Sequence, residues 1–272
     1  MPAIFSTNLA AADHVGSTEN SFVTVTGSAT THTKGAWTEL IPATSADGYW
    51  LSIATRDDTG SSSSVSSILL DIGIGAAGLE TVLVPDIPIG HSQISMQTMP
   101  GFTIPVFVPS GSRISARLQG NVASDTAVMF CEVRSVAGAA PTDWPGITND
   151  WEHLGIDAAV SSGTVLGTSW TEIVASTAAA YQQIIAMPHA GTDGTLGNNH
   201  IIDVGSGAAA AEVRQYGFEM RTTGSEETET LFPPPAFFAM YWRPWEATSG
   251  TRLVGRSDTS TNPARISFLV VQ

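Results

Sequence analysis

The sequence predicts an all-β protein built from two tandem antiparallel β-sandwich domains that are jelly-roll-like and related by internal duplication. The apolar segments are short, and Gly, Pro, Ser, Asp and Asn separate them. Charged residues make up only 13% of the 272 residues, with one lysine, Lys34, so little is left for the wet faces of helices. Several blocks of sequence also occur twice in the same order.

The repeated blocks are the strongest of these observations. They keep a nearly constant separation of about 133 residues, which increases only between the second and third blocks. This increase places an insertion in the second copy around residues 241–246. The pairs are WTELI at 37–41 and WTEIV at 170–174, ILLDIGIGAA at 68–77 and HIIDVGSGAA at 200–209, and SGSRI at 110–114 and SGTRL at 249–253.

A repeat of this length corresponds to a whole domain and is too long for a solenoid or propeller unit. A stretch rich in Gly, Ala and Pro between the copies is typical of a linker. We therefore expect an N-terminal arm at 1–20, a first sandwich at 21–136, a linker at 137–151 and a second sandwich at 152–272.

Within the first copy, alternating and β-branched segments predict the strands in order. The prolines at 105 and 109 suit an edge strand, and Arg113 and Arg117 share the polar face of another strand. About eight strands with long loops favour a jelly roll over an immunoglobulin domain. Only the alanine runs at 10–12 and 208–211 suggest a helical turn. Strands are expected at 21–26, 50–54, 65–74, 103–109, 113–118 and 127–133, and at 265–271 in the second copy.

Charge and hydropathy exclude several classes of function. The net charge of −14 without a basic run argues against nucleic-acid binding. No apolar stretch approaches the roughly 18 residues of a membrane span. The first residues lack the features of a secretory signal, so we expect the chain to fold in the cytoplasm.

No catalytic, cofactor or metal site is expected from the motifs. The GIGAAG segment at 73–78 matches a dinucleotide-binding pattern, but the β-branched, proline-containing segment after it is no helix, so we expect a glycine-rich strand end. Asp71 and Asp203 are interpreted as acceptors at turns. Cys131 is interpreted as a core residue. Calcium binding near residues 57–58 or in the acidic run at 226–229 is left open.

The recurring arginines and carboxylates form a set of expected ion pairs. These arginines are expected to pair within their own domain, with a contact to a neighbouring subunit as the alternative. They are Arg113 and Arg117 in the first copy, and Arg252 and Arg256 in the second. The expected carboxylate partners are Glu39 and Glu80 in the first copy, and Glu172 and Glu212 in the second.

Aromatic residues supply the candidate contact site. Aromatic and arginine side chains are favoured at protein interfaces, and aromatic rings stack on sugars. The alternative is that the loop folds back over an open end of the sandwich. The candidates for contact with a partner or a glycan are Tyr241, Trp242, Arg243 and Trp245 in the insertion, and Trp144 and Trp151 in or beside the linker.

The segments at 70–78 (LDIGIGAAG) and 104–117 (IPVFVPSGSRISAR) resemble tailed-bacteriophage virion structural proteins with tandem jelly-roll modules. The resemblance implies a non-enzymatic component of the capsid-decorating, head-fibre or tail-accessory type, made in the host cytoplasm and located in the virion. It implies other virion proteins as partners, and we also expect homo-oligomers. The alternative is a carbohydrate-binding module that attaches to a host-surface glycan.

Overall fold

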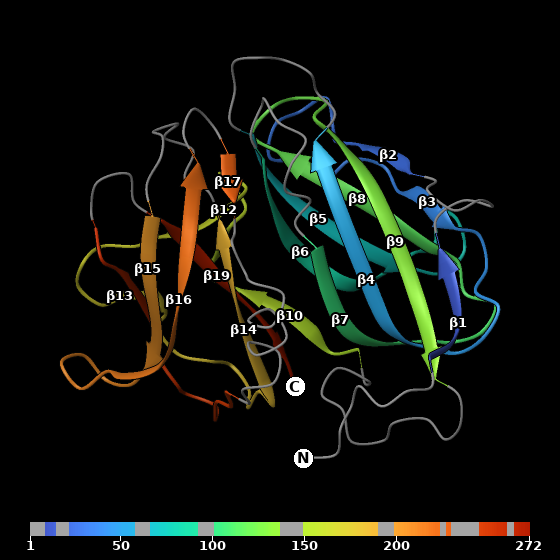
Figure 1. Ribbon diagram of the computed structural model, residues 1–272. Coiled ribbons are helices and arrows are strands. Elements are labelled where there is room, and N and C mark those ends of the chain that lie inside the picture. The colour runs from blue at the N-terminus through green and yellow to red at the C-terminus, as the bar shows by residue number, and fades with distance from the viewer. Residues whose placement is uncertain are drawn as a thin grey trace.

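Antiparallel β-sheets form the architecture of the computed structural model (Figure 1). The structure describes residues 9–14, 22–57, 66–91, 101–136, 149–189, 199–223, 227–229, 245–259 and 264–272, and none of these is helical. We call residues 9–136 the first half and residues 149–272 the second half. The first half contains β1 (Leu9–His14), β2 (Val23–Thr26), β3 (Thr38–Ile41), β4 (Gly48–Asp57), β5 (Ser66–Ile74), β6 (Thr81–His91), β7 (Gly101–Val108), β8 (Ile114–Gly120) and β9 (Thr126–Val136).

The first half is a jelly roll. One sheet has the order β1-β9-β4-β7, with β2 also on β9, and the other has the order β3-β8-β5-β6. Along the chain from β2 to β9, successive strands change sheet at every step except between β5 and β6. This connectivity is the double Greek key of a jelly roll and confirms the expected fold class. β7 is an edge strand, as its prolines predicted.

The second half repeats this strand order. One sheet has the order β13-β18-β15-β16, with β17 added on β16; in the other, β10 and β12 lie along one side of β19 and β14 along its other side. A counterpart of β7 would fall within 230–244, outside the described residues. The strands are β10 (Trp151–Leu154), β11 (Ile156–Asp157), β12 (Ser162–Val165), β13 (Thr171–Val174), β14 (Gln183–His189), β15 (Asn199–Ser206), β16 (Val213–Thr223), β17 (Glu227–Glu229), β18 (Leu253–Ser257) and β19 (Arg265–Val271).

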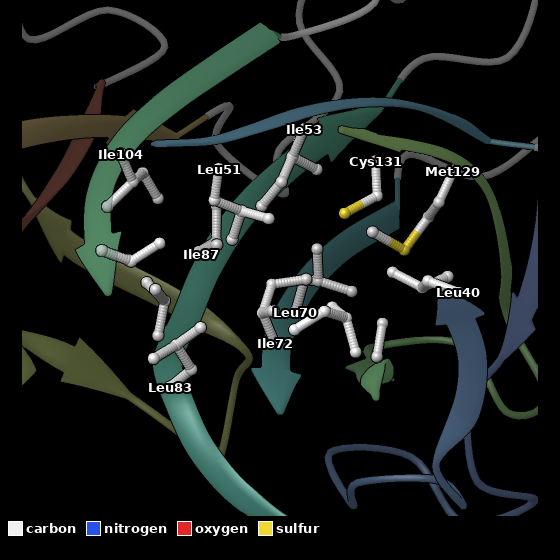
Figure 2. Packing of buried hydrophobic residues seen from close by; sticks show 14 of the residues in the cluster. Leu40, Leu51, Ile53, Leu70, Ile72, Leu83, Ile87, Ile104, Met129 and Cys131 are labelled. Atoms are coloured by element: carbon white, nitrogen blue, oxygen red, sulfur yellow. The ribbon is translucent and has the colours of Figure 1, made fainter. Parts of the chain in front are cut away.

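An apolar layer lies between the two sheets of each half. Figure 2 shows the layer of the first half, where β4, β5, β7 and β9 supply aliphatic side chains and the buried Cys131. Cys131 is therefore a core residue, as expected. The layer of the second half is more aromatic, with Tyr181, Tyr216, Trp245 and Phe268 among its buried members.

The glycine-rich strand ends have the backbone geometry that the sequence predicted. Gly75 has a φ of +124° and Gly207 a φ of +125°. A Cβ on Gly75 would lie 3.1 Å from the Leu79 carbonyl oxygen, and the φ itself disfavours any side chain. The chain thus turns from β5 into β6, and from β15 into β16, without the helix that a dinucleotide site requires.

The alanine-rich N-terminal segment differs from its prediction. Residues 10–12, expected to lie in an arm and to suggest a helical turn, belong to β1, which pairs with β9 through contacts such as Asp13 with Val133. Pairing with an open sheet edge outweighs the helical preference of alanine. The second run, 208–211, forms a hydrogen-bonded turn in which the Ala211 amide donates to the Ala208 carbonyl.

Candidate functional site

The junction between the two halves is the most elaborate site in the described part of the chain, and we call it the seam. The outer face of the sheet formed by β10, β19 and β14 packs against β6 of the first half (Figure 1). Its side chains belong to the same apolar cluster as the first-half core. They are Trp151, Ile185, Met187, Leu269 and Val271, all at most 6% exposed.

Hydrogen bonds close the edge of β7 against this face. The Trp151 Nε1–H donates to the Pro105 carbonyl at 3.0 Å. The Asn149 side chain donates from Nδ2 to the Phe107 carbonyl at 2.7 Å and accepts the Phe107 amide on Oδ1 at 2.8 Å. These groups satisfy backbone positions that an edge strand otherwise leaves open to another chain.

A tight turn of the second half forms the polar part of the seam. Ser161 has a φ of +52°, which directs its backbone and hydroxyl toward the first half. Its carbonyl accepts the Ser67 hydroxyl at 2.5 Å, and its Oγ lies 3.1 Å from Gln119 Nε2 and 3.0 Å from His32 Nδ1. Ser161, Ser67 and Gln119 are all buried, so these bonds replace water at the junction.

His153 bridges the halves within the same junction. Its Nε2 lies 2.6 Å from Ser267 Oγ and its Nδ1 lies 3.3 Å from the Pro85 carbonyl. Because a carbonyl only accepts, Nδ1 carries a proton, and the ring is neutral at pH 7 because burial keeps its pKa low. Burial lowers the pKa of His153 to about 4, and the opposing attraction of Asp86 does not offset it.

The structure corrects two of the predicted contact residues. Trp245 is 4% exposed and packs edge-on against Tyr216 and Phe268, at centroid distances of 5.7 and 5.3 Å. Trp151 is 6% exposed and lies in the seam. Neither indole offers an open face to an outside partner, because each covers apolar side chains of its own chain.

Four other predicted contact residues lie outside the described residues. They are Trp144, Tyr241, Trp242 and Arg243, and their contact role stays a prediction. The buried position of Trp245 agrees with the alternative in which this end of the insertion covers the sandwich.

The predicted glutamate pairs are confirmed for Arg113 and Arg252, whereas Arg117 and Arg256 pair with aspartates instead. The Arg113 guanidinium donates to Glu39 and Glu80, each at 2.7 Å. Arg252 donates to Glu172 at 2.7 Å and Glu212 at 2.9 Å, and these hydrogen bonds raise the pKa of Arg252. Each arginine therefore ties together three strands or turns at one end of a sheet.

A second repeated cluster surrounds the two matching aspartates. Asp71 accepts Lys34 Nζ at 2.7 Å, Arg117 Nε at 2.8 Å and the Asp86 amide at 2.9 Å. The interpretation of Asp71 as a backbone acceptor is therefore correct only in part, since cations are its main partners.

The counterpart in the second half is also an aspartate between two cations, with an arginine in the place of Lys34. Asp203 accepts Arg214 and Arg256, and Arg256 lies over the Trp170 ring at 4.6 Å, as Arg117 does over Trp37 at 4.5 Å. Each guanidinium group therefore stacks on an indole ring and pairs with a carboxylate, which links neighbouring strands of the sheet.

The structure also brings together a serine, a histidine and an aspartate that the sequence reasoning missed. His200 Nδ1 and Asp258 Oδ1 lie 3.3 and 3.4 Å from Ser257 Oγ. In a catalytic triad the carboxylate orients the imidazole, whereas here it contacts the hydroxyl. His200 and Ser257 are 1% and 2% exposed, so this hydroxyl does not meet a substrate. His200 lies on β15 and Ser257 on β18, so the two side chains meet only because these strands pair in the structure.

Two kinds of feature are absent from the described residues. These residues contain no group of three or more His, Cys, Asp or Glu side chains arranged to hold a metal ion. They also contain no helix of the length and apolar character needed to cross a bilayer.

No family model and no curated protein matches the chain. Among solved structures, PNGase F, a glycosylasparaginase from Flavobacterium meningosepticum, is similar over 93% of this chain and 96% of its own, with 10% identity and a TM-score of 0.38. The STIV MCP, a viral major capsid protein, is similar over 92% and 96%, with 8% identity and a TM-score of 0.36. The tandem CBM22 domains of Paenibacillus barcinonensis Xyn10C cover 87% and 82%, with 10% identity and a TM-score of 0.24. These values assign none of the three activities to this chain, and its fold class rests on the sheet topology.

Proposed function

We propose that the chain is a non-enzymatic structural protein of a bacteriophage virion, a capsid-decorating or tail or fibre accessory component that acts through protein–protein interfaces. The observation that carries the proposal is the seam. Apolar side chains of both halves share one cluster, and Ser161, Trp151 and His153 each form hydrogen bonds across the junction.

The shared apolar cluster distinguishes this junction from the more polar contacts of domains that move independently. A fixed pair of jelly rolls presents its outer surfaces in one defined geometry. A protein that occurs in many identical copies in a particle needs such a geometry, because every copy must meet its neighbours in the same way. The internal ion pairs of both halves support the same role, since they hold strand ends rather than a ligand.

The proposal is tested on particles. Phage particles purified on a density gradient and dissolved for quantitative mass spectrometry should contain the chain in a fixed ratio to the major coat protein. An antibody against the chain should then label either the heads or the tails in electron micrographs. Recovery of the chain only in the particle-free lysate would contradict the proposal.

The carbohydrate-binding alternative depends on an exposed aromatic platform. The burial of Trp245 removes one of the two indoles that such a platform would use. On a glycan array, we expect no specific binding by the purified chain. Binding that disappears in Trp242→Ala but persists in a control at an exposed residue, Leu79→Ala, would favour the alternative.

A further inference from the structure

The seam buries the outer face of the sheet formed by β10, β19 and β14 in the second half. The strands of this sheet correspond one by one to strands of the first half. Ile184 on β14 is paired with Val270 on β19, and both point into the second core. The neighbouring pair, Ile185 and Leu269, therefore points outward, and the seam covers it.

The matching face of the first half is the outer side of β2, β9 and β4. Ile53 is paired with Cys131, and both point into the first core, so the neighbouring pair, Ala54 and Phe130, points outward. We call this the open face. Phe22 lies against Phe130, with ring centroids 6.5 Å apart, and is 51% exposed.

The polar rim of the open face is already neutralised. Glu132 and Arg134, further along β9, form an ion pair with each other at 2.7 Å. An approaching surface would therefore meet the Phe22 and Phe130 rings beside a charge pair that is already neutralised.

The first-half surface that the seam covers, around β5, corresponds to an exposed surface around β15 of the second half. In the first half, the β5 side of the junction includes Ser67, which bonds to Ser161, and the fully buried Leu69. The repeated sequence blocks align Leu69 with Ile201 on β15. The strand registers agree with this alignment, because Asp71 is paired with Arg117 in the first half as Asp203 is paired with Arg256 in the second. Ile201 is 56% exposed.

We infer that the open face around Phe22 and Phe130 binds a second copy of this chain through the β15 surface around Ile201. The contact between copies repeats the orientation of the seam, in which the outer face of one jelly roll packs against the β5–β6 side of the other. Because the two surfaces differ, the contact is head-to-tail, and further copies add in the same direction until a ring closes or a filament grows. The inference deepens the proposed function by naming the neighbour as this chain itself.

Sedimentation velocity of the purified chain over a wide range of concentrations tests the contact. The wild type should form oligomers as its concentration rises, and Phe22→Asp and Ile201→Asp should each weaken the association by more than about tenfold. Leu79→Asp is the matched control, because Leu79 is 78% exposed but lies in the turn between β5 and β6, away from the open face. Near-ultraviolet circular dichroism confirms that each variant is folded.

A mixture of the two variants distinguishes head-to-tail association from other modes. Phe22→Asp retains the β15 surface and Ile201→Asp retains the open face, so the mixture should form a heterodimer that grows no further. If Phe22→Asp does not fold, the Phe22→Cys/Ile201→Cys protein should form disulfide-linked multimers, whereas Phe22→Cys/Leu79→Cys should not. The native Cys131 is buried and does not take part.

A wild type that stays monomeric at all concentrations, a Phe22→Asp protein that associates normally, or a mixture without a heterodimer would each overturn the inference. The assay uses the purified chain alone, whereas the proposed function is tested by the composition of particles. Either can therefore fail while the other stands.

Discussion

The neutral His153 ring in the seam makes the stability of the folded chain sensitive to acid. In the unfolded chain the ring has its ordinary pKa of 6.5, and burial in the folded chain lowers this pKa to about 4. Between these two values only the unfolded state takes up the proton, so stability falls as the pH is lowered from about 6.5 to about 4. The charged neighbours are Asp86, which favours the protonated ring, and Lys34, which opposes it.

The size of the effect follows from the difference between the two pKa values. It corresponds to roughly 2–3 kcal/mol of unfolding free energy, after allowance for the partial exposure of the ring. The matched variant is His153→Gln, whose amide can donate to the Pro85 carbonyl and accept from Ser267 without titrating.

Urea unfolding of both proteins, followed by tryptophan fluorescence at about pH 7 and about pH 4, isolates this contribution. Carboxylate titration is common to both proteins and cancels in the comparison. The wild type should lose roughly 2–3 kcal/mol more than His153→Gln between the two pH values. Parallel losses in the two proteins would refute the reasoning.

Three further predictions concern the ion clusters, the seam and the core. Asp71→Asn should cost about 2–3 kcal/mol of stability in urea unfolding, because its buried carboxylate pairs with Lys34 and Arg117, although Asp86 still pairs with Lys34 in the variant. Asp203→Asn, whose arginine partners are 41–55% exposed, should cost about 1 kcal/mol, and equal losses would contradict this. Trp151→Phe should cost about 1–3 kcal/mol in the same assay, since the Pro105 carbonyl loses its donor, and an unchanged midpoint would contradict the role of this bond. The Cys131 thiol, whose pKa burial raises to about 12, should react with a thiol reagent only in denaturant, and rapid reaction of the native protein would contradict its burial.

The fold and the ion pairs within each half were predictable because their determinants are local or repeated in the sequence. Alternating segments gave the strands, and the repeated arginines and glutamates gave the clusters around Arg113 and Arg252. The β1 strand was missed because its alanines carry no strand preference, and only pairing with β9 makes them extended.

The sequence of β19 carries a signature of the seam. Residues 266–271 of β19 form a nearly unbroken apolar run, of which Phe268 and Val270 face the second core while Leu269 and Val271 face the first half. A strand with both faces buried loses the alternation of a half-exposed strand. The sequence therefore marked a second buried face, but it did not specify which partner covers that face.

Trp245 is a residue for which the sequence pattern indicated a surface contact but the structure shows burial. Aromatic residues beside arginine and proline are typical of interfaces, but the same residues close the open end of a sandwich, and composition does not distinguish the two. Only the positions of Tyr216 and Phe268 against its ring place this residue in the core.

The central claim is that the seam joins two jelly rolls into one rigid building block, and differential scanning calorimetry tests it most directly. We expect a single unfolding transition whose calorimetric enthalpy equals its van't Hoff enthalpy, because neither half can unfold without exposing the shared apolar cluster. Two separate transitions, each with the enthalpy of one half, would contradict it.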